Sequence, residues 1–378
     1  MGSRRFTGSR PSGSGVFWAR LRGATPTGVL KLMMLANQLT IVVVTFNSMR
    51  VLPSFLRRVG EALAGERCGI LVCDNGSEDG VEGFLRRESG EISFLGSGKN
   101  EGYGAALNRG IVAAKTPYVA LMNPDVAIQP GGFRRLVDFM QERPQAAGVS
   151  GIVVHLREYP ASFAGDRLFP RGEVPVHFGY ENVMTRMSFY TGLQTKFPNR
   201  RWLVPWSMVP ASDEISVSRL NGCFGVFRRD ALMEVGLFDP RLFLYFEEDD
   251  LARRLIGRGY KLYVTARTIV VHLSGTGSAA TGFKATDLVL LNSQYIFFRK
   301  HYGRWYAWAG FFAIWGVITL GVAYRVLVRG GRGSLRHLWT WHLQSLLRGG
   351  GLPAGTIPGE GREGVNYNWS APIKQGEM

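Results

Sequence analysis

Four short apolar runs between residues 39 and 122 decide the fold of this chain. The first reads Leu39-Thr-Ile-Val-Val-Val-Thr45, and the others span Gly69–Cys73, Ile92–Leu95 and Tyr118–Met122. Helical spacing after each run predicts helices over Met49–Leu63, Gly80–Arg87, Gly104–Ala114 and Gly131–Glu142. Apolar strands that alternate with helices indicate an α/β fold whose parallel sheet is covered on both faces. Because ligands of such sheets bind at the carboxyl ends of the strands, polar residues just past each strand are the candidate site.

Downstream of residue 154 the pattern changes. Residues 155–218 lack a clear period and are rich in Pro, aromatic residues and Arg, which predicts a functional insertion. Regular structure is predicted again as a strand at Asn221–Arg228, a helix from Asp249 to about Arg258, and strands at Lys261–Val264 and Ile269–His272. We expect a disordered basic tail (1–37), a folded unit (38–302, with halves 38–154 and 155–302), hydrophobic and amphipathic helices (303–348) and a flexible tail (349–378).

The positive charge is concentrated at the two ends of the chain. The 378 residues contain 45 Lys and Arg against 29 Asp and Glu, a formal net charge of +16. Residues 1–60 hold nine of these bases and residues 288–359 hold eight, and neither stretch contains an acid. The body between them is close to neutral, which argues against a nucleic-acid partner, because nucleic-acid-binding domains carry basic residues on the folded body. Basic ends on a neutral body suit anionic membrane lipid.

An uncharged stretch of twenty residues, Trp305–Tyr324, follows the folded unit. As a helix it would be about 30 Å long, which equals the thickness of the hydrocarbon core of a bilayer. Arginines flank it on both sides, and Leu335–Leu347 has amphipathic spacing. A full crossing would place the second group of arginines outside, against the positive-inside tendency, so we expect a membrane-associated segment that does not cross fully. A buried core helix is the alternative.

Polar residues end the first two predicted strands. Thr45 and Asn47 stand at the end of the first strand, and Asp74 and Asn75 stand at the end of the second, before a Gly-Ser turn. An Asp at this place can accept a hydrogen bond from the ring N–H of a pyrimidine base. The alternative is that a residue of the turn caps the next helix, and the motif alone leaves the two interpretations even.

A glycine-containing segment, Asn100-Glu-Gly-Tyr-Gly104, follows the third strand, with Asn108 one turn further on. The glycines let the backbone approach a ligand closely, and the following helix offers its N-terminus to an anion. A Walker loop is incomplete here because Asn100 replaces its Ser or Thr, and a dinucleotide fingerprint is incomplete because Leu107 replaces its third glycine. This segment therefore does not support a site for kinase-like nucleotide hydrolysis or for nicotinamide chemistry.

Asn123-Pro-Asp125 follows the fourth strand. A carboxylate above the crevice could hold a divalent ion that bridges two phosphates. In isolation the motif favours a turn, because Asn-Pro-Asp is common turn chemistry. His272, at the end of a later strand, could be a metal ligand or a phosphate contact, although a lone His is more often structural.

Four consecutive carboxylates, Glu247–Asp250, directly follow the apolar run Leu242–Phe246. Their mutual repulsion raises the pKa of at least one of them, which is how a general base is tuned. The predicted helix begins within them, and its dipole favours their charge. A solvated acidic cap of the helix is the alternative. It explains the four acids, but it does not explain why they directly follow an apolar run that is expected to pack in a core.

In this order, the segments resemble the family 2 glycosyltransferases with a GT-A fold, a Rossmann-like mixed sheet flanked by helices. They are most similar to the bacterial rhamnosyltransferase-like branch. The six matching motifs are Val44-Thr-Phe-Asn47, Val72-Cys-Asp-Asn-Gly-Ser77, Asn100-x-Gly102 with Asn108-x-Gly110, Asn123-Pro-Asp125, Asn221-Gly-Cys-Phe-Gly225 and Phe238–Leu251, and the single residue His272 matches as well. Each motif is weak alone, but six in register from about residue 39 to 301 are specific.

The resemblance implies an inverting, metal-dependent enzyme of cell-envelope glycan synthesis at the cytoplasmic face of the membrane. It would transfer a sugar, with L-rhamnose from dTDP-rhamnose expected, from a nucleoside-diphosphate sugar to a hydroxyl of a lipid-linked or polysaccharide acceptor. The implied donor-binding residues are Thr45, Asn47, Asp74, Asn75, Asn100, Gly102, Asn108, Asn123 and Asp125. The implied acceptor-binding residues are Asn221, Gly222, Cys223 and Glu247, and the implied ligands of Mg²⁺ or Mn²⁺ are Asp125 and His272.

Two positions depart from the family pattern. Asn123 stands where many relatives have the first Asp of a DxD pair, and the usual Glu-Asp reads Glu247-Glu248. Alignment on Asp250 makes Glu248 the catalytic base, with Asp249 the second candidate. The same departures leave open a catalytically inactive relative that binds nucleotide-sugar as a scaffold of a glycan assembly complex.

Overall fold

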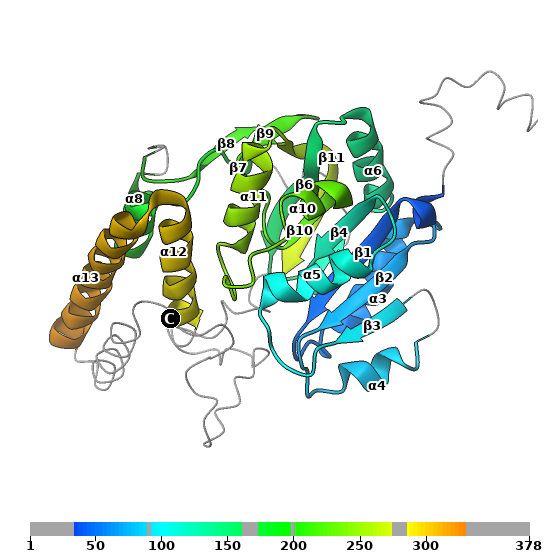
Figure 1. Cartoon of the computed structure of the whole chain (residues 1–378), viewed down its shortest axis with the longest axis horizontal. Coiled ribbons are helices and arrows are strands. Elements are labelled where there is room, and N and C mark those ends of the chain that lie inside the picture. The colour runs from blue at the N-terminus through cyan, green and yellow to red at the C-terminus, as the bar shows by residue number, and fades with distance from the viewer. Residues whose placement is uncertain are drawn as a thin grey trace, which may run out of the picture.

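The computed structural model describes residues 34–88, 92–160, 173–197, 200, 202–273 and 286–329 (Figure 1). Most of the predicted N-terminal tail, the amphipathic stretch Leu335–Leu347 and the predicted tail 349–378 lie outside these residues. The fold consists of a large mixed sheet between two layers of helices, with a further helical layer beside it.

In the described residues, the large sheet has nine strands in the order β3-β2-β1-β4-β10-β6-β11-β5, and β9 pairs with β11. Its strands are β1 (Leu39–Thr45), β2 (Gly69–Asp74), β3 (Ile92–Gly96), β4 (Tyr118–Met122), β5 (Val126–Ile128), β6 (Ala146–Leu156), β9 (Ile215–Val217), β10 (Phe224–Arg228) and β11 (Lys261–Leu273). Strand β1 is parallel to β2 and β4, whereas β10 is antiparallel to β4, with Phe224 opposite Met122. The residues that precede β10 therefore lie at the same sheet edge as the residues that follow β4.

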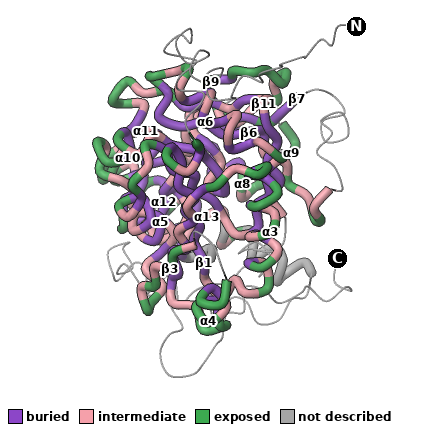
Figure 2. The backbone as a smooth tube through the Cα atoms, turned by 90° about the vertical axis from the view of Figure 1, so that its right-hand side faces the viewer, coloured by how far each residue is buried: buried purple, intermediate pink, exposed green. Residues whose placement is uncertain are grey.

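Alternation along β1 explains the two layers of helices. All seven residues of β1 are buried. Ile41 and Val43 point into one apolar core with the helices α3 (Leu52–Leu63), α4 (Val81–Leu85) and α6 (Gly132–Glu142), while Val42 and Val44 point into the other with α5 (Tyr103–Ala113), α10 (Arg229–Glu234) and α11 (Glu247–Gly257). Figure 2 shows the buried backbone gathered in the centre of the molecule.

The predicted strands and helices of the first half are confirmed to within a few residues at their ends. One later prediction is wrong: the two strands expected at 261–264 and 269–272 are a single strand, β11, whose register against β6 shifts between Thr265 and Ile269. Such an irregularity absorbs extra residues without ending the ladder. The predicted insertion contains a two-stranded sheet of β7 (Glu173–His177) and β8 (Trp206–Pro210), and the helices α8 (Val183–Thr191) and α9 (Leu193–Lys196).

The helices α12 (Thr286–Tyr302) and α13 (Arg304–Arg329) form the further layer, joined at Gly303 with a φ of 93°. A third apolar core holds α13 against α12 through Ala307, Phe311 and Ile314, so the first turns of α13 pack onto the protein. Within the part of the chain that the structure describes, no helix is both long enough and apolar enough to cross a membrane.

Candidate active site

Asp74, at the end of β2, organises the loops along one edge of the crevice. Its Oδ1 accepts hydrogen bonds from Thr45 Oγ1 (2.7 Å) and Ser77 Oγ (2.5 Å), and its Oδ2 accepts from the backbone N–H groups of Gly76 (3.1 Å) and Ser77 (2.8 Å). The Asn47 N–H donates to Ser77 Oγ at 2.8 Å, which ties the loop after β1 into the same network. Thr45 is 0% exposed and its hydroxyl positions Asp74, while its contact with the donor stays a prediction.

The turn after β2 does not cap the next helix. The N-cap of α4 is Gly80, and no side chain of the described residues makes a cap hydrogen bond there. The carboxylate of Asp79 accepts instead from the Met49 N–H at 2.7 Å. The polar turn therefore shapes the crevice, and Asp74 remains the candidate for a contact with the base of the donor.

Asn75 joins the loop after β2 to the loop before α5. Its Nδ2 donates to Asn100 Oδ1 at 3.1 Å and to the Gly102 carbonyl at 3.0 Å, and Asn75 itself is only 3% exposed. Gly102 has a φ of 93°, and a Cβ at this position would lie 2.5 Å from the Phe243 carbonyl oxygen. The glycine therefore permits a close approach of the Phe243 backbone. Asn75 and Gly102 have structural roles in these loops, and their contacts with the donor stay predictions.

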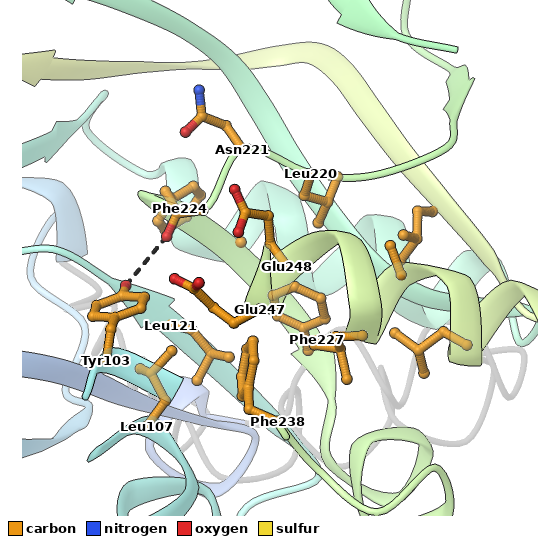
Figure 3. Close-up of a pocket in the computed structure, with 16 residues that line it drawn as sticks. Tyr103, Leu107, Leu121, Leu220, Asn221, Phe224, Phe227, Phe238, Glu247 and Glu248 are labelled. Atoms are coloured by element: carbon orange, nitrogen blue, oxygen red, sulfur yellow. Dashed lines mark hydrogen bonds between the residues drawn. The ribbon is translucent and has the colours of Figure 1, made fainter. Parts of the chain in front are cut away.

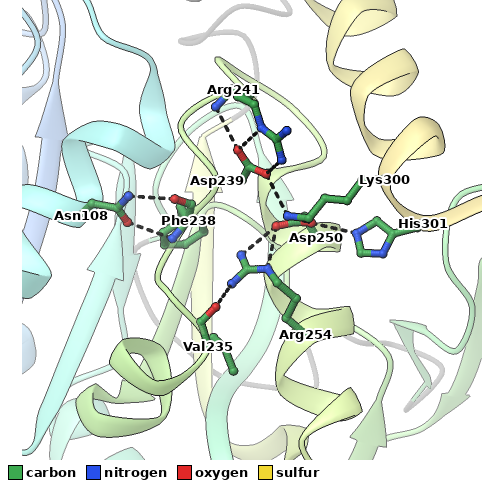
Figure 4. Close-up of polar contacts among 9 residues, drawn as sticks. All are labelled: Asn108, Val235, Phe238, Asp239, Arg241, Asp250, Arg254, Lys300 and His301. Atoms are coloured by element: carbon green, nitrogen blue, oxygen red, sulfur yellow. Dashed lines mark hydrogen bonds and ion pairs between the residues drawn. The ribbon is translucent and has the colours of Figure 1, made fainter. Parts of the chain in front are cut away.

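Asn108 is also structural. Its Nδ2 donates to the Phe238 carbonyl and its Oδ1 accepts from the Phe238 N–H, both at 2.9 Å (Figure 4). Because both ends of the amide bind one backbone unit, the side chain fastens α5 to the segment that leads into α11. The donor-binding role predicted for Asn108 stays a prediction beside this structural role.

Asp125 and His272 face each other at the edge of the sheet. Asp125 Oδ1 lies 3.3 Å from His272 Nε2. His272 Nδ1 lies 3.2 Å from Nδ1 of His155, whose Nε2 lies 3.4 Å from Asn221 Nδ2. His155 thus connects the predicted metal ligands, Asp125 and His272, to Asn221 in the predicted acceptor-binding turn. Sequence reasoning missed His155, because only the parallel register of β6 and β11 pairs it with His272.

The turn Asn221–Cys223 lies directly beside Asn123. The Asn123 N–H donates to the Cys223 carbonyl at 3.0 Å, and the Cys223 N–H donates to Asn221 Oδ1 at 3.2 Å. The Cys223 thiol is buried, and burial raises its pKa. Its side chain belongs to the core, and its acceptor contact stays a prediction, whereas Asn221 and Gly222 line a pocket.

That pocket opens between the turn, α5 and the start of α11 (Figure 3). The carboxylate of Glu247 points towards Tyr103, and that of Glu248 points towards Asn221. The Tyr103 hydroxyl donates to the Gly222 carbonyl at 3.2 Å, and a Cβ on Gly222 would lie 3.3 Å from Glu248 Oε1. The remaining wall is apolar and includes Leu107, Leu121, Leu220, Phe224, Phe227 and Phe238. The buried carboxylate of Glu247 and the partly exposed carboxylate of Glu248 therefore line a largely apolar pocket.

A sharp turn of the backbone directs these acids inward. Tyr245 and Phe246, just before α11, have φ values of 71° and 67°. Bulky residues rarely adopt this left-handed conformation, which costs roughly 1–2 kcal/mol per residue. Phe246 is held in place by core packing, with its ring centroid 5.2 Å from that of Phe297. The strain is concentrated where α11 must begin with its carboxylates facing the pocket.

Arg219 is the cation that two of these carboxylates share. Its Nη1 lies 3.2 Å from Glu248 Oε1, and its Nε lies 3.3 Å from Asp249 Oδ1. Burial raises the pKa of Asp249 to about 7, although Arg219 opposes the rise. Burial, and then the charge of Glu248, raise the pKa of Glu247 well above its usual range. Asp249 is 3% exposed and faces Arg219 rather than the pocket, so Glu248 is the better placed base.

Asp250 is a structural anchor (Figure 4). Its Oδ1 pairs with Lys300 Nζ at 2.7 Å and His301 Nε2 at 2.8 Å, and its Oδ2 pairs with Arg254 at 2.7 Å. Burial alone would raise the pKa of Asp250, but these hydrogen bonds and charges lower it. The last acid of the block therefore ties α11 to α12 and takes no part in the pocket.

Arg219→Gln is expected to destabilise the fold by about 3–5 kcal/mol, because it leaves buried carboxylates without their shared cation. Urea unfolding of the purified variant measures this loss. Arg219→Lys should recover part of it, since the charge remains but the two-pronged geometry is lost. Unfolding of Arg219→Gln at the wild-type urea concentration would contradict the assignment.

Stability is expected to depend on pH through Asp249. Its folded pKa of about 7 lies above the ordinary value of 3.8, so the folded state binds the proton more tightly. The contribution is favourable at low pH and is lost as pH rises from about 4 to about 7, by at most about 1.4 kcal/mol per pH unit. Asp249→Asn should flatten this part of the profile when unfolding is measured between pH 5 and 8. An unchanged slope in the variant would refute the raised pKa.

Comparison with known proteins places these features in a family. The family described as Glycosyl transferase family 2 matches residues 40–236, more than half of the chain. Two proteins of Mycobacterium tuberculosis (strains CDC 1551 / Oshkosh and ATCC 25618 / H37Rv) are each 28% identical to it over 287 residues, which cover 72% of this chain and 87% of theirs. Both are named N-acetylglucosaminyl-diphospho-decaprenol L-rhamnosyltransferase.

Among solved structures, the crystal structure of GalNAc-T7 with UDP, GalNAc and Mn²⁺ is similar at a TM-score of 0.47 and 15% identity. The match covers 63% of this chain and 44% of that one. The family match confirms the resemblance that the motifs predict: this chain belongs to glycosyl transferase family 2.

Proposed function

We propose that this glycosyltransferase moves L-rhamnose from dTDP-rhamnose to a hydroxyl of a lipid-linked acceptor, with inversion at the anomeric carbon. The observation that carries the proposal is the position of the Glu248 carboxylate. It points into the pocket beside Asn221, and Arg219 holds it in place. The names of the two relatives, which act on a decaprenol-linked acceptor, support the acceptor class and the sugar.

Glu248 acts as the general base in this proposal. Its carboxylate takes the proton of the acceptor hydroxyl as the oxygen forms a bond to the anomeric carbon. The bond from that carbon to the diphosphate breaks on the opposite face of the sugar, which inverts the configuration. Asn221 and Gly222, on the same side of the pocket, orient the acceptor, and Glu247, with its raised pKa, can donate a hydrogen bond to it.

Asp125 and His272 fit a divalent metal ion. The 3.3 Å between Asp125 Oδ1 and His272 Nε2 is close to the separation of two neighbouring ligands that each lie about 2.1 Å from one ion. In the described residues, no group of three or more His, Cys, Asp or Glu could hold a metal, so diphosphate oxygens and water would complete the shell of Mg²⁺ or Mn²⁺. Such an ion would stabilise the negative charge of the departing diphosphate.

The enzyme is proposed to work at the cytoplasmic face of the cell membrane, with lipid as a partner, because nucleotide-sugars are made in the cytosol and the acceptor is lipid-linked. Basic residues close to the anionic surface each contribute about 1 kcal/mol to attachment. The sequence around α13 is free of acids from residue 288 to 359. This charge pattern suits attachment to one leaflet.

The test is transfer from radiolabelled dTDP-rhamnose to a polyprenyl-diphospho-N-acetylglucosamine acceptor, with and without Mn²⁺. Product NMR should show the anomeric configuration opposite to that of the donor. A panel of other nucleotide-sugars serves as the control for donor choice. If the protein binds the donor but neither transfers the sugar nor hydrolyses the donor, the result would favour the catalytically inactive scaffold. The departures from the family pattern at Asn123 and Glu248 are the reason for considering that alternative.

A further inference from the structure

Exposed apolar side chains gather on one group of helices. Among the described residues, thirteen large apolar side chains are exposed, and eight of them lie on α8, on α9, in the segment that follows α9, or on α13. These eight are Met184, Phe189, Leu193, Phe197, Trp202, Trp305, Phe312 and Leu320. A concentration of this kind marks an interaction surface rather than the scattered apolar exposure of a typical protein surface.

Helix α13 is apolar on two opposite sides. Trp305, Phe312 and Leu320 are 79%, 50% and 72% exposed, and their spacing of seven and eight residues places them along one face. Ala307 and Ile314 are fully buried and lie on the opposite face, against α12. Within the described part of the chain, the inner side is therefore packed against the protein and the outer side stays exposed, as a docking face would be.

Helices α8 and α13 are locked together. The Val183 N–H donates to the Tyr306 hydroxyl at 3.1 Å. A Cβ on Gly310 would lie 2.5 Å from Val183 Cγ2, so the glycine is what permits this approach. The insertion that carries α8 and α9 and the C-terminal helix are thus one structural unit (Figure 1).

Charge indicates what covers this unit. The sequence contains no acid between residues 182 and 212, nor between 288 and 359. Lys196, Arg200 and Arg304 are exposed among the apolar side chains. Exposed Trp with neighbouring cations and no acids is the pattern of a surface that binds the interface of an anionic bilayer.

We propose that the α8–α9 hairpin with Trp202, together with the outer face of α13, forms a composite docking surface for anionic lipid, with α13 lying along the membrane. This inference rests on the proposed membrane attachment and deepens it, because it gives the insertion that carries α8 and α9 its own lipid contact. It also relates the site to the membrane. Arg186 of α8 donates to Gln294 at 3.2 Å and lies 5.7 Å from the centre of the Phe246 ring, directly before the acidic start of α11.

The test is flotation of the full chain with phosphatidylcholine vesicles that contain 25% phosphatidylglycerol, and with pure phosphatidylcholine vesicles. The pairs Leu193→Glu with Trp202→Glu, and Trp305→Glu with Phe312→Glu, should each lower the bound fraction at least tenfold. Val112→Glu with Met233→Glu is the matched control, because these exposed side chains lie on α5 and α10, and it should float like wild type. Thermal melts and nucleotide binding verify that each variant is folded.

Wild-type flotation of the Leu193/Trp202 pair would overturn the composite surface, and equal binding to neutral vesicles would overturn the choice of anionic lipid. A dimer that the Trp305/Phe312 pair converts to monomer, with flotation unchanged, would assign the face to a second copy of the chain. Activity on a short, water-soluble acceptor should be the same in all variants. Absence of that activity in wild type would defeat the proposed function without touching the flotation result.

Discussion

Glu248→Gln is expected to lower kcat by roughly 10²–10⁴-fold, because the amide keeps the shape of the side chain but cannot accept the proton of the acceptor hydroxyl. Donor affinity should stay close to that of wild type, since Asp74 and Asp125 lie on other loops. The measurement is kcat with saturating donor and acceptor, together with the Kd of the nucleotide by calorimetry.

Asp249→Asn is the matched control for the base. Asp249 is buried beside Arg219 and does not line the pocket, so this variant should retain kcat within a few-fold of wild type at pH 7. Severe loss in Asp249→Asn with a mild effect in Glu248→Gln would show that the base lies one residue further along the helix.

Asp125→Ala is expected to abolish transfer, because the departing diphosphate would lose the carboxylate that we propose as a ligand of its metal ion. Stabilisation of the protein by nucleotide with Mn²⁺, followed as a shift in Tm, should disappear at the same time. Asp125→Asn keeps the shape and should be nearly as inactive, because a neutral amide holds the cation poorly.

His272→Ala completes this series and should weaken the Mn²⁺ response less than Asp125→Ala does. Asp125 is 7% exposed, so it is a buried group and not the exposed crevice carboxylate that its place in a turn suggests. A melt of the ligand-free variant is therefore needed to separate lost metal binding from lost stability. Full activity of a folded Asp125→Ala, or of wild type in excess chelator, would contradict the metal role.

The sequence by itself determined the strands β1 to β4, the helices that follow them and the edge of the sheet that carries the site. The run Leu39–Thr45 contains four consecutive apolar residues, Ile41–Val44, which is typical of a strand covered on both faces, and the structure buries all seven residues. The same pattern assigns the polar residues that follow β1, β2 and β4 to one edge of the sheet, the edge at the carboxyl ends of these strands. Order along the chain also predicted the family, because six weak motifs in register are jointly specific.

The roles of the individual polar residues at that edge were decided only by the tertiary structure. Asn108 binds the backbone of Phe238 with both ends of its amide, and the Asp74 carboxylate accepts four hydrogen bonds from Thr45 and the turn after β2. Glu248 and Asp250 are two residues apart, yet one faces the pocket and the other is held by α12.

Arg219 and His155 had no local signal, because their partners are about 30 and 117 residues away in the chain. Hydrogen-bond partners at such separations depend on strand register and on how α11 packs against the sheet. The local sequence pattern contains no information on strand register or on helix packing. The sequence therefore predicts the edge of the sheet and the family, while only the tertiary structure shows which side chains face the pocket.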